Sequence, residues 1–504
     1  PSGKDTGSIN VTNLKPGDTV TAYQFVKADY NEYGFTGYSA INNYVKDPVA
    51  PTAQEVIDMA SNAATMTVAA EKKVATGDTE VTLNGLPVGY YLVMVTSGSE
   101  TVYSPMIAGI YYSKSATDNT LTNGAISADS DFEIKAQKCW AKSSTPKLEK
   151  TIVTPSSKNS KGDDIAIGDK TTFNLSATVP SYSKEYKKVT YKIYDIMSEG
   201  LDYVDGSMKC FIEKYENNRE NIKVTPKVNG GMIEITFDSK FILEHPGQKI
   251  QVEYQAKLNE KAGVNFDANI NKAYLEYSNN PASGSTAKTG EDKVYVYTFG
   301  INSNLFGKST EKWNEKTKEL IKVEEGEYQW VETEKESGIF TTTTALEGAT
   351  FTLTNNKTKK SYTATSDKYG YLKFTGLDAG EYTLQETDAP DGFTLNDAKH
   401  TVVITAEYNQ DGTLKSYTIK IDDKATSTYT ATYDKGVIKT ITSTKDSQGN
   451  ISESAILKNS KMSFLPSTGG VGTTIFAIVG VVFVVAALGL HMILRGKSKL
   501  EQDR

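Results

Sequence analysis

Residues 374–387 read FTGLDAGEYTLQET and contain the motif Gly-Leu-x-x-Gly-x-Tyr. The glycines mark a turn, and the residues after them have the composition of a β-strand. The same motif occurs in LNGLPVGYYLVMV, residues 83–95. One turn-and-strand unit at two distant places in the chain predicts two related β-sandwich domains.

Alternating apolar and polar residues extend this pattern through the chain ahead of residue 464. Period-two alternation, typical of half-buried strands, occurs in TVTAYQFV, TFNLSATV, KIQVEYQAKL, TVVITAEY and SYTIKI, with short Gly, Asn and Asp turns between such stretches. We therefore expect an all-β fold of tandem immunoglobulin-like β-sandwiches. Helical patterns are confined to PTAQEVIDMASNAA, residues 51–64, which begins with an N-cap, and NEKTKELIKVEE, residues 314–325.

Composition excludes several classes of function. The net charge of −7 is spread without basic blocks, which argues against nucleic acid as a partner. The histidines His245, His400 and His491 are scattered, so the sequence shows neither a His-based triad nor a metal cluster, and we expect no enzyme, metal or cofactor. Cys139 and Cys210 cannot supply a disulfide framework, and the sequence leaves open whether they pair or remain free thiols.

The C-terminal end carries an apolar run, TTIFAIVGVVFVVAALGLHMIL, over residues 473–494. It is long enough for the ~20 residues that a membrane-spanning helix requires. The basic residues Arg495, Lys497, Lys499 and Arg504 follow it, which predicts a cytoplasmic C-terminus and an exported remainder. This topology requires a secretory signal peptide, which we expect to be missing ahead of Pro1.

A short motif precedes the apolar run: Leu465, Pro466, Ser467, Thr468 and Gly469. An ordinary tail anchor would explain the helix and the basic tail but not this pentapeptide. The three features together resemble the LPXTG cell-wall sorting signal of Gram-positive bacteria. The resemblance implies that a sortase cysteine attacks the Thr468 carbonyl, releases Gly469 and holds a thioester until an amine replaces it. The helix then serves as a transient membrane tether.

Breaks in the strand pattern divide the chain into domains of the expected ~100 to 200 residues. KCWAKSSTPKLEK, residues 138–150, interrupts the alternation with small residues and a proline. We expect domains over residues 1–143, 144–298 and 299–463, followed by the sorting signal over residues 464–504.

The third domain resembles the collagen-adhesin B-type domains of Gram-positive pilins. LEGATFTLTN, GYLKFTGLDAGEYTLQETDAPDGF and AILKNSKMSFLPSTGG are similar, in order, to their first strand, E-box region and last strand. The resemblance implies a spontaneous isopeptide bond between Lys308 and Asn459, with Glu386 as the catalyst. A segment over residues 309–344 separates Lys308 from ALEGATF and departs from the compact family pattern.

This chemistry needs a buried site. Burial lowers the pKa of a lysine, which leaves a neutral amine as the nucleophile, and raises the pKa of a carboxylic acid, which keeps it protonated. A protonated Glu386 would hydrogen-bond the Asn459 amide oxygen and relay protons while ammonia leaves. The alternative interpretation is a surface ion pair between Lys308 and Glu386.

The second domain resembles the fimbrial isopeptide-forming domain of backbone pilins, on the strength of PKLEKTI, IGDKTTFNLSATVPSY, YKIYDIMSEGL and NKAYLEYSNNP. The resemblance implies Lys150 as the amine, Asp195 as the catalytic acid and Asn271 as the amide. Asn271 has the strand parity of the apolar residues that follow it, and Asn279, with the same parity, is the second choice. The alternative interpretation is that Asp195 satisfies a turn. When the two Gly-Leu-x-x-Gly-x-Tyr stretches are aligned, Val95 of the first domain takes the position of Glu386 in the third. We therefore expect no isopeptide bond of this type in the first domain.

Two classes of function remain open. The first is a backbone pilin, joined by a pilus-specific sortase to other copies of itself and to accessory pilins, and attached to peptidoglycan by a housekeeping sortase. The second is a wall-anchored or tip adhesin for a host protein or glycan. The first requires an acceptor lysine between the first two domains. Backbone pilins carry a motif of the form V-Y-P-K there, and CWAK makes Lys142 the favoured acceptor over Lys135, Lys138 and Lys147.

Overall fold

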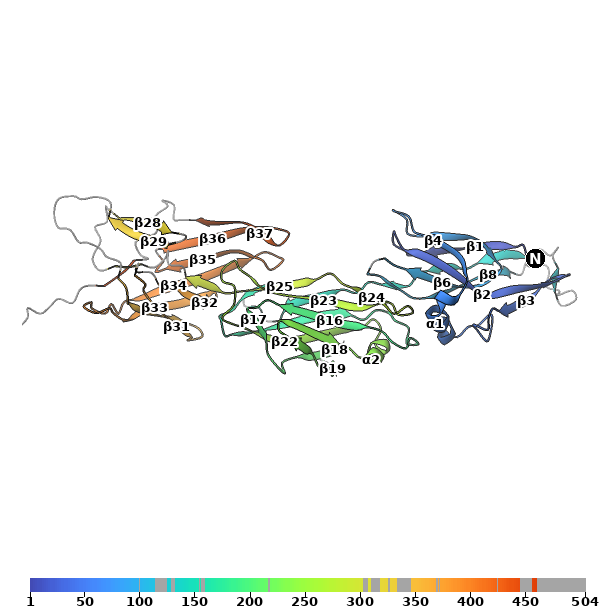
Figure 1. Cartoon of the computed structure of the whole chain (residues 1–504), viewed down its shortest axis with the longest axis horizontal. Helices are drawn as coiled ribbons and strands as arrows, with labels where there is room; N and C mark the ends of the chain where they lie inside the picture. The colour runs from blue at the N-terminus through green and yellow to red at the C-terminus, as the bar shows by residue number, and fades with distance from the viewer. Residues whose placement is uncertain are drawn as a thin grey trace, which may run out of the picture.

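The computed structural model of the chain shows three β-sandwich domains in a row (Figure 1). The predicted all-β class is confirmed. The pentapeptide at 465–469 and the apolar run at 473–494 lie outside the described residues, and within those residues no helix is long and apolar enough to cross a membrane. The structure describes residues 1–98, 100–113, 125–127, 132–153, 155, 159–215, 218–301, 307–309, 318–324, 327–332, 346–368, 370, 372–423, 425–444 and 456–459.

The first domain packs two sheets around one apolar core. Its strands are β1 (Thr6–Thr12), β2 (Thr19–Asn31), β3 (Gly34–Ala40), β4 (Val68–Lys73), β5 (Val81–Pro87), β6 (Gly89–Thr96), β7 (Val102–Tyr103), β8 (Met106–Ser113), β9 (Ile126–Ser127), β10 (Glu133–Ala136), β11 (Lys138–Trp140) and β12 (Ser143–Ser144). The small sheet has the order β11-β1-β5, and the large one has the order β10-β8-β6-β2-β3-β9 with β4 beside β2. Val11, Val20 and Tyr91 are fully buried between them.

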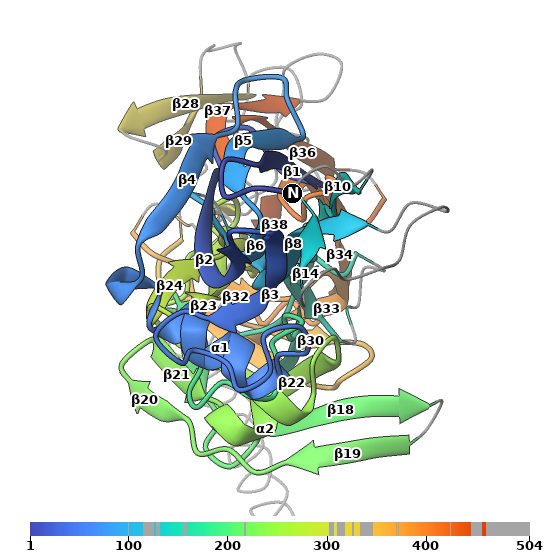
Figure 2. The ribbon, with the colours of Figure 1, turned by 90° about the vertical axis from the view of Figure 1, so that its right-hand side faces the viewer.

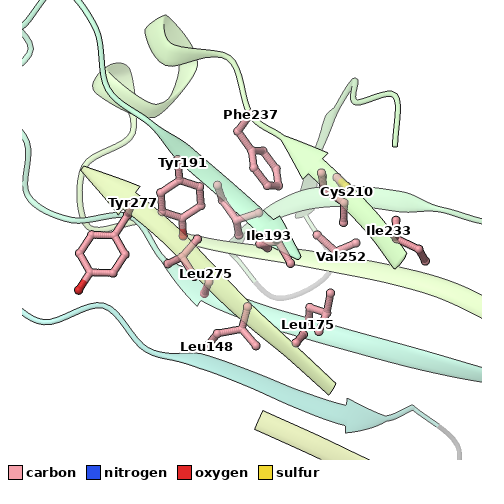
Figure 3. Close-up of a cluster of buried hydrophobic side chains, with 14 of the residues drawn as sticks. Leu148, Leu175, Tyr191, Ile193, Cys210, Ile233, Phe237, Val252, Leu275 and Tyr277 are labelled. Atoms are coloured by element: carbon pink, nitrogen blue, oxygen red, sulfur yellow. The ribbon is translucent and has the colours of Figure 1, made fainter. Parts of the chain in front are cut away.

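The second domain repeats this arrangement. Its strands are β13 (Leu148–Ile152), β14 (Gly162–Asp164), β15 (Lys170–Thr178), β16 (Tyr191–Met197), β17 (Leu201–Tyr203), β18 (Lys209–Tyr215), β19 (Asn218–Ile222), β20 (Lys227–Asn229), β21 (Met232–Thr236), β22 (Lys249–Leu258), β23 (Asn269–Asn280), β24 (Ser285–Lys288) and β25 (Asp292–Tyr297). One sheet contains β13-β15-β22-β18-β19, and the other contains β14-β25-β23-β16-β21-β20. Inward side chains from both sheets, such as Leu175, Ile193 and Val252, form its core (Figure 3). The β18–β19 hairpin projects sideways (Figure 2).

The third domain is built on one large sheet of order β31-β30-β33-β34-β35-β36-β37. Short pairs β26-β32, β27-β38 and β28-β29 accompany it. Phe351, Leu384 and Ile404 belong to its buried core. The strands are β26 (Phe299–Ile301), β27 (Gly307–Ser309), β28 (Lys318–Glu324), β29 (Glu327–Glu332), β30 (Thr350–Asn355), β31 (Ser361–Thr365), β32 (Phe374–Leu377), β33 (Gly380–Asp388), β34 (Lys399–Tyr408), β35 (Leu414–Ile421), β36 (Ala425–Asp434), β37 (Val437–Thr444) and β38 (Ile456–Lys458).

The helical expectations have mixed outcomes. The helix at 51–64 is confirmed as α1 (Ala53–Ser61), which begins with a capping box between Thr52 and Glu55. The prediction of a helix at 314–325 is wrong, because β28 in that segment pairs antiparallel with β29. Local helix propensity takes no account of such a partner strand. Sequence reasoning missed α2 (Ser239–Glu244), although its N-cap Asp238, which accepts a hydrogen bond from the Phe241 backbone at 2.9 Å, was a usable signal.

The second and third domains share apolar packing across their junction. Only Thr298 separates β25 from β26, and its hydroxyl donates to the Leu377 carbonyl at 3.1 Å. Tyr295 and Tyr297 of β25 pack in the same buried cluster as the core of the third domain. The two domains are therefore joined by a continuous apolar core as well as by the chain.

Candidate functional site

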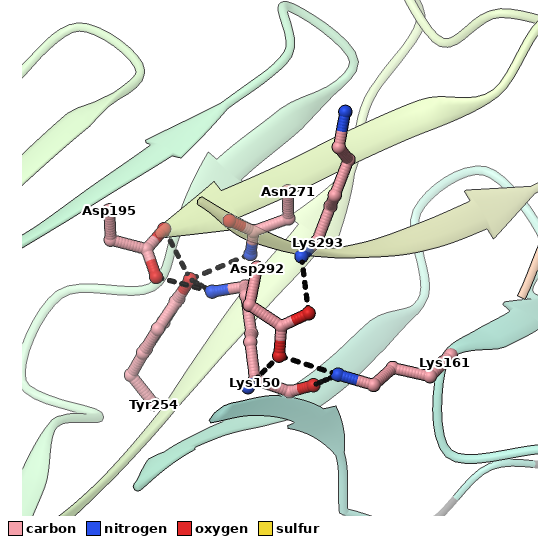
Figure 4. Close-up of polar contacts among 7 residues, drawn as sticks. All are labelled: Lys150, Lys161, Asp195, Tyr254, Asn271, Asp292 and Lys293. Atoms are coloured by element: carbon pink, nitrogen blue, oxygen red, sulfur yellow. Dashed lines mark hydrogen bonds and ion pairs between the residues drawn. The ribbon is translucent and has the colours of Figure 1, made fainter. Parts of the chain in front are cut away.

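A buried polar cluster lies between the two sheets of the second domain (Figure 4). Lys150 comes from β13 and Tyr254 from β22 in one sheet, while Asp195 of β16 and Asn271 of β23 come from the other. All four residues are fully buried. The side chains of one sheet thus meet those of the opposite sheet inside an apolar core.

Strand periodicity explains how Asn271 and Asp195 come together. From Asn269 to Tyr277 of β23, residues of the same parity as Asn271 are buried and the alternate ones are half-buried, as the period-two pattern requires. β16 and β23 are antiparallel neighbours in which Asp195 pairs with Ala273 and Met197 pairs with Asn271. The acid and the amide therefore lie on adjacent strands and point into the same core. Asn279, at the end of β23, is half-buried and accepts a hydrogen bond from the Ser285 hydroxyl at 2.7 Å.

The cluster is continuously hydrogen-bonded. The Lys150 ammonium forms a short ion pair with Asp195 Oδ2, and it lies 3.1 Å from the Tyr254 hydroxyl. That hydroxyl donates to Asp195 Oδ1 at 2.8 Å and accepts from Asn271 Nδ2 at 2.7 Å. Sequence reasoning missed Tyr254. Its inward parity in KIQVEYQAKL predicts burial but does not show that its hydroxyl contacts the Lys150, Asp195 and Asn271 side chains.

Burial sets the protonation of this cluster. It lowers the pKa of Lys150, against the attraction of Asp195, and it raises the pKa of Asp195, against the attraction of Lys150. Both shifts favour a neutral amine beside a neutral acid. The Lys150 nitrogen also lies over the rings of Phe173 and Tyr254, at 5.1 and 5.2 Å from their centroids. The site is thus largely apolar around one ionisable pair.

A second pair of charges holds the backbone of Lys150. Asp292 Oδ2 accepts from the Lys150 backbone amide at 2.7 Å, and Lys161 Nζ donates to the Lys150 carbonyl at 2.6 Å. Lys161 and Asp292 also form an ion pair at 2.6 Å. Both residues are partly exposed, so the pair closes the edge of the sandwich where the amine enters the core.

The third domain contains a related pair at the end of its sheet. Glu386 of β33 and Asn459, just after β38, are each 2% exposed. Asn459 Nδ2 donates to Glu386 Oε1 and Oε2 at 2.9 and 3.0 Å, and to the Thr394 carbonyl at 3.1 Å. The amide presents its nitrogen to the carboxyl group, whereas the resemblance implies a hydrogen bond from a protonated Glu386 to the amide oxygen.

Lys308 can be placed only by its backbone. It lies in β27, which runs parallel to β38, and it pairs with Leu457, two residues before Asn459. Its side chain lies outside what the structure describes. Of the intervening segment 309–344, the structure describes Ser309 and the β28–β29 hairpin. The backbone thus brings Lys308 and Asn459 onto neighbouring strands.

Lys142 lies at the junction between the first and second domains. It is exposed and stands between β11 and β12, outside any strand. Its neighbours are fixed: the Ala141 amide donates to the Thr12 carbonyl at 3.0 Å, and the Lys142 carbonyl accepts from the Ser104 amide at 3.0 Å. Trp140, beside it, is 70% exposed. The other candidates are also exposed, but Lys135 and Lys138 lie within strands, Lys135 is paired with Glu133, and Lys147 adjoins β13.

Three family models match separate parts of the chain. Residues 4–143 match the family of the T6 antigen Ig-like domain, residues 339–422 match the SpaA prealbumin-like fold domain, and residues 458–499 match the LPXTG cell wall anchor motif. The chain is 26% identical to the trypsin-resistant surface T6 protein of Streptococcus pyogenes serotype M6, over 99% of this chain and 96% of that protein. These matches support the identification of the chain as a sortase-assembled major pilin.

The solved structure of the T6 backbone pilin agrees with this fold. The T6 backbone pilin of serotype M6 S. pyogenes is similar to this pilin with a TM-score of 0.58 and 20% identity, over 91% of this chain and 99% of that chain. The major pilin SpaD of Corynebacterium diphtheriae has a TM-score of 0.48 and 16% identity, over 92% of this chain and 98% of that chain. The matches to the LPXTG cell wall anchor motif and to a streptococcal surface protein support a cell wall-anchored protein on the surface of a Gram-positive bacterium. The T6 relative is a backbone pilin, which is a structural subunit.

The remaining sequence candidates take structural positions in the pilin. Cys139 and Cys210 are free buried thiols in different domains, and burial raises their pKa to about 11 and about 12. His245 Nδ1 bonds the Phe241 carbonyl at 2.7 Å, and His400 pairs with Asp422. In the described part of the chain no three His, Cys, Asp or Glu side chains are grouped as a metal site. Val95 in β6 is a buried core residue.

Proposed function

We propose that a pilus-specific sortase joins copies of this pilin head to tail, from Thr468 of one subunit to Lys142 of the next. Accessory pilins would join the same fibre, and a housekeeping sortase would attach its base to peptidoglycan. Two intramolecular bonds, Lys150–Asn271 and Lys308–Asn459, would cross-link the second and third domains. The first domain, with Val95 in place of the acid, would have no bond of this type.

The contrast between Lys142 and Lys150 carries the proposal. An amine that an external enzyme must reach has to be exposed, and Lys142 is exposed beside a domain junction. An amine that reacts inside the fold has to be neutral and shielded from water, and Lys150 is fully buried beside Asp195. Lys142 and Lys150 are therefore suited to different kinds of amide formation, although they lie only eight positions apart.

The internal reaction follows from the contacts. Once Asp195 has taken a proton from the Lys150 ammonium, the neutral nitrogen attacks Asn271 Cγ, and ammonia leaves as the new amide forms. In the third domain Glu386 already contacts the Asn459 nitrogen that has to be protonated, at 2.9 and 3.0 Å. The first bond would tie β13 to β23, and the second would tie β27 to the end of β38.

The polymer is tested on the cell-wall fraction of the producing bacterium. The unchanged pilin should give a ladder of high-mass species on an immunoblot. Lys142→Arg keeps the charge but removes the usable amine, so it should abolish the ladder and leave wall-linked monomer. Lys138→Arg and Lys147→Arg are the matched controls and should keep the ladder. An unchanged ladder with Lys142→Arg would mean that another lysine is the acceptor, and a single band from the unchanged pilin would refute polymerisation.

The internal bonds are tested by intact mass. The purified pilin should be lighter than its sequence by one ammonia for each bond, and Asp195→Ala and Glu386→Ala should each restore one. Glu291→Ala, which removes an exposed acid paired with Lys272 in the same domain, should restore none. A pilin whose mass equals that of its sequence would show that neither bond forms.

A further inference from the structure

Tyr254 lies at the centre of the reactive cluster in the second domain. It is fully buried on β22, and its ring packs against Phe173 and Tyr203 with centroids 5.6 and 5.9 Å away. The packing fixes the position of its hydroxyl. That oxygen is 3.1 Å from Lys150 Nζ, 2.8 Å from Asp195 Oδ1 and 2.7 Å from Asn271 Nδ2. One hydroxyl thus touches the amine, the acid and the amide.

The two cross-link centres differ at the leaving nitrogen. In the third domain the Asn459 nitrogen donates to both oxygens of the Glu386 carboxylate. In the second domain the Asn271 nitrogen donates to the Tyr254 hydroxyl, and Asp195 contacts that hydroxyl and Lys150. The acid of the second domain is therefore separated from the leaving nitrogen by Tyr254. The hydroxyl is therefore the group placed to pass a proton to this nitrogen.

We propose that Tyr254 is a catalytic residue, a proton relay between the two nitrogens that exchange places on Asn271 Cγ. This inference rests on the proposed Lys150–Asn271 bond and adds a fourth participant to it. The hydroxyl accepts a proton from Lys150 Nζ and gives its own proton to Asn271 Nδ2. Both transfers run along contacts of hydrogen-bonding length, 3.1 and 2.7 Å.

The protons and charges balance. Asp195 takes one proton from the Lys150 ammonium, which leaves a neutral amine and a neutral acid. The amine attacks Asn271 Cγ and forms the new C–N bond, so that the carbon becomes tetrahedral. Tyr254 then accepts one proton from Nζ while its own proton goes to Nδ2, and the bond from Cγ to Nδ2 breaks. The products are one amide N–H, one ammonia and a protonated Asp195, with no net change of charge.

The test compares two buried tyrosines of the same core. Tyr254→Phe removes the relay and keeps the ring. Tyr191→Phe is the matched control, because Tyr191 is 1% exposed and its hydroxyl has no hydrogen-bond partner among the described residues. The full-length pilin is pulse-labelled during synthesis, and the fraction with a Lys150–Asn271 cross-linked peptide is followed by mass spectrometry.

We expect the Tyr254→Phe bond to form about 10²-fold more slowly than in the unchanged pilin, the lower end of what proton transfer by a positioned side chain contributes. Tyr191→Phe should react at the unchanged rate. Equal rates for Tyr254→Phe and the unchanged pilin would overturn the relay. If the unchanged pilin itself lacks the cross-linked peptide, the proposed bond fails and the relay fails with it.

A second variant covers the case in which Tyr254→Phe does not fold. Site-specific incorporation of 3,5-difluorotyrosine at position 254 keeps the ring and the hydroxyl but makes the hydroxyl more acidic. If Tyr254 relays the proton, the rate of bond formation should change severalfold and its pH profile should shift. If the hydroxyl only positions its neighbours, the profile should stay unchanged. An unchanged rate and profile in the folded protein would overturn the inference.

Discussion

Asp164 is the buried carboxyl that meets the third domain from β14. Its Oδ1 accepts from the Ala379 backbone amide at 2.5 Å, and its Oδ2 accepts from the Tyr408 hydroxyl at 2.6 Å. Burial nevertheless raises the pKa of Asp164 to about 6, because removal of the carboxylate from water outweighs these two hydrogen bonds. Asp163 and Asp378 nearby raise it further.

This raised pKa gives the junction a pH dependence with a definite sign. The folded state holds the Asp164 proton more tightly than the unfolded chain does. The contribution of Asp164 to the free energy of unfolding is therefore complete below about pH 4 and is lost as the pH rises through about 6. Asp164→Asn should remove this component, which is roughly 3 kcal/mol at most. The midpoint of thermal unfolding, measured from pH 4 to pH 7, should fall less steeply with pH in Asp164→Asn than in the unchanged pilin.

Asp169→Asn is the control for Asp164→Asn, because Asp169 is a partly exposed acid at the same junction, paired with Lys360 at 3.2 Å. Its curve should parallel that of the unchanged pilin. Parallel curves for all three proteins would show that Asp164 is ionised alike in the folded and unfolded states.

At the scale of elements, the contact between β14 and the turn from β34 to β35 sets the spacing of two domains. A Cβ built on Gly162 would lie 2.1 Å from the Gly412 carbonyl oxygen, and one built on Gly412 would lie 2.3 Å from the Lys161 carbonyl oxygen. The Asn159 side chain donates to the Asn409 carbonyl at 2.8 Å beside this contact. The two backbones touch without room for a methyl group.

Gly162→Ala should therefore separate the second and third domains. The clash is with backbone, which cannot rotate away as a side chain can, and overpacking of this kind typically costs about 1 to 3 kcal/mol. Gly290→Ala is the control, since no atom lies within 4 Å of a Cβ there. The unfolding midpoint and the rate of limited proteolysis at the junction measure the effect. If the two variants behave alike, the close approach does not hold the junction together.

At the scale of the whole molecule, local periodicity of the sequence is sufficient to predict the β-sandwiches but not the contacts between them. The parity of Asn271 follows from alternation along one strand, which requires no knowledge of the neighbours. Tyr254 has the same kind of signal, yet its role depends on which strands of the opposite sheet face it. Asp164 and Gly162 depend on a domain more than 200 residues away in the chain. The helix predicted at 314–325 failed for the same reason, because β28 is determined by its partner strand.

The position of Lys142 has a mechanical consequence. If subunits are joined at Lys142 and Thr468, tension along the fibre enters each subunit between β11 and β12, at the end of the first domain, and leaves behind the third domain. The first domain, up to β11, then hangs beside the tensile path and carries no load, which fits its lack of the acid that a cross-link would require at Val95. The second and third domains carry the whole load in series. In the second domain the proposed bond at Lys150 lies eight residues beyond the point of attachment. Only this short length of chain could then extend before the covalent bond bears the tension.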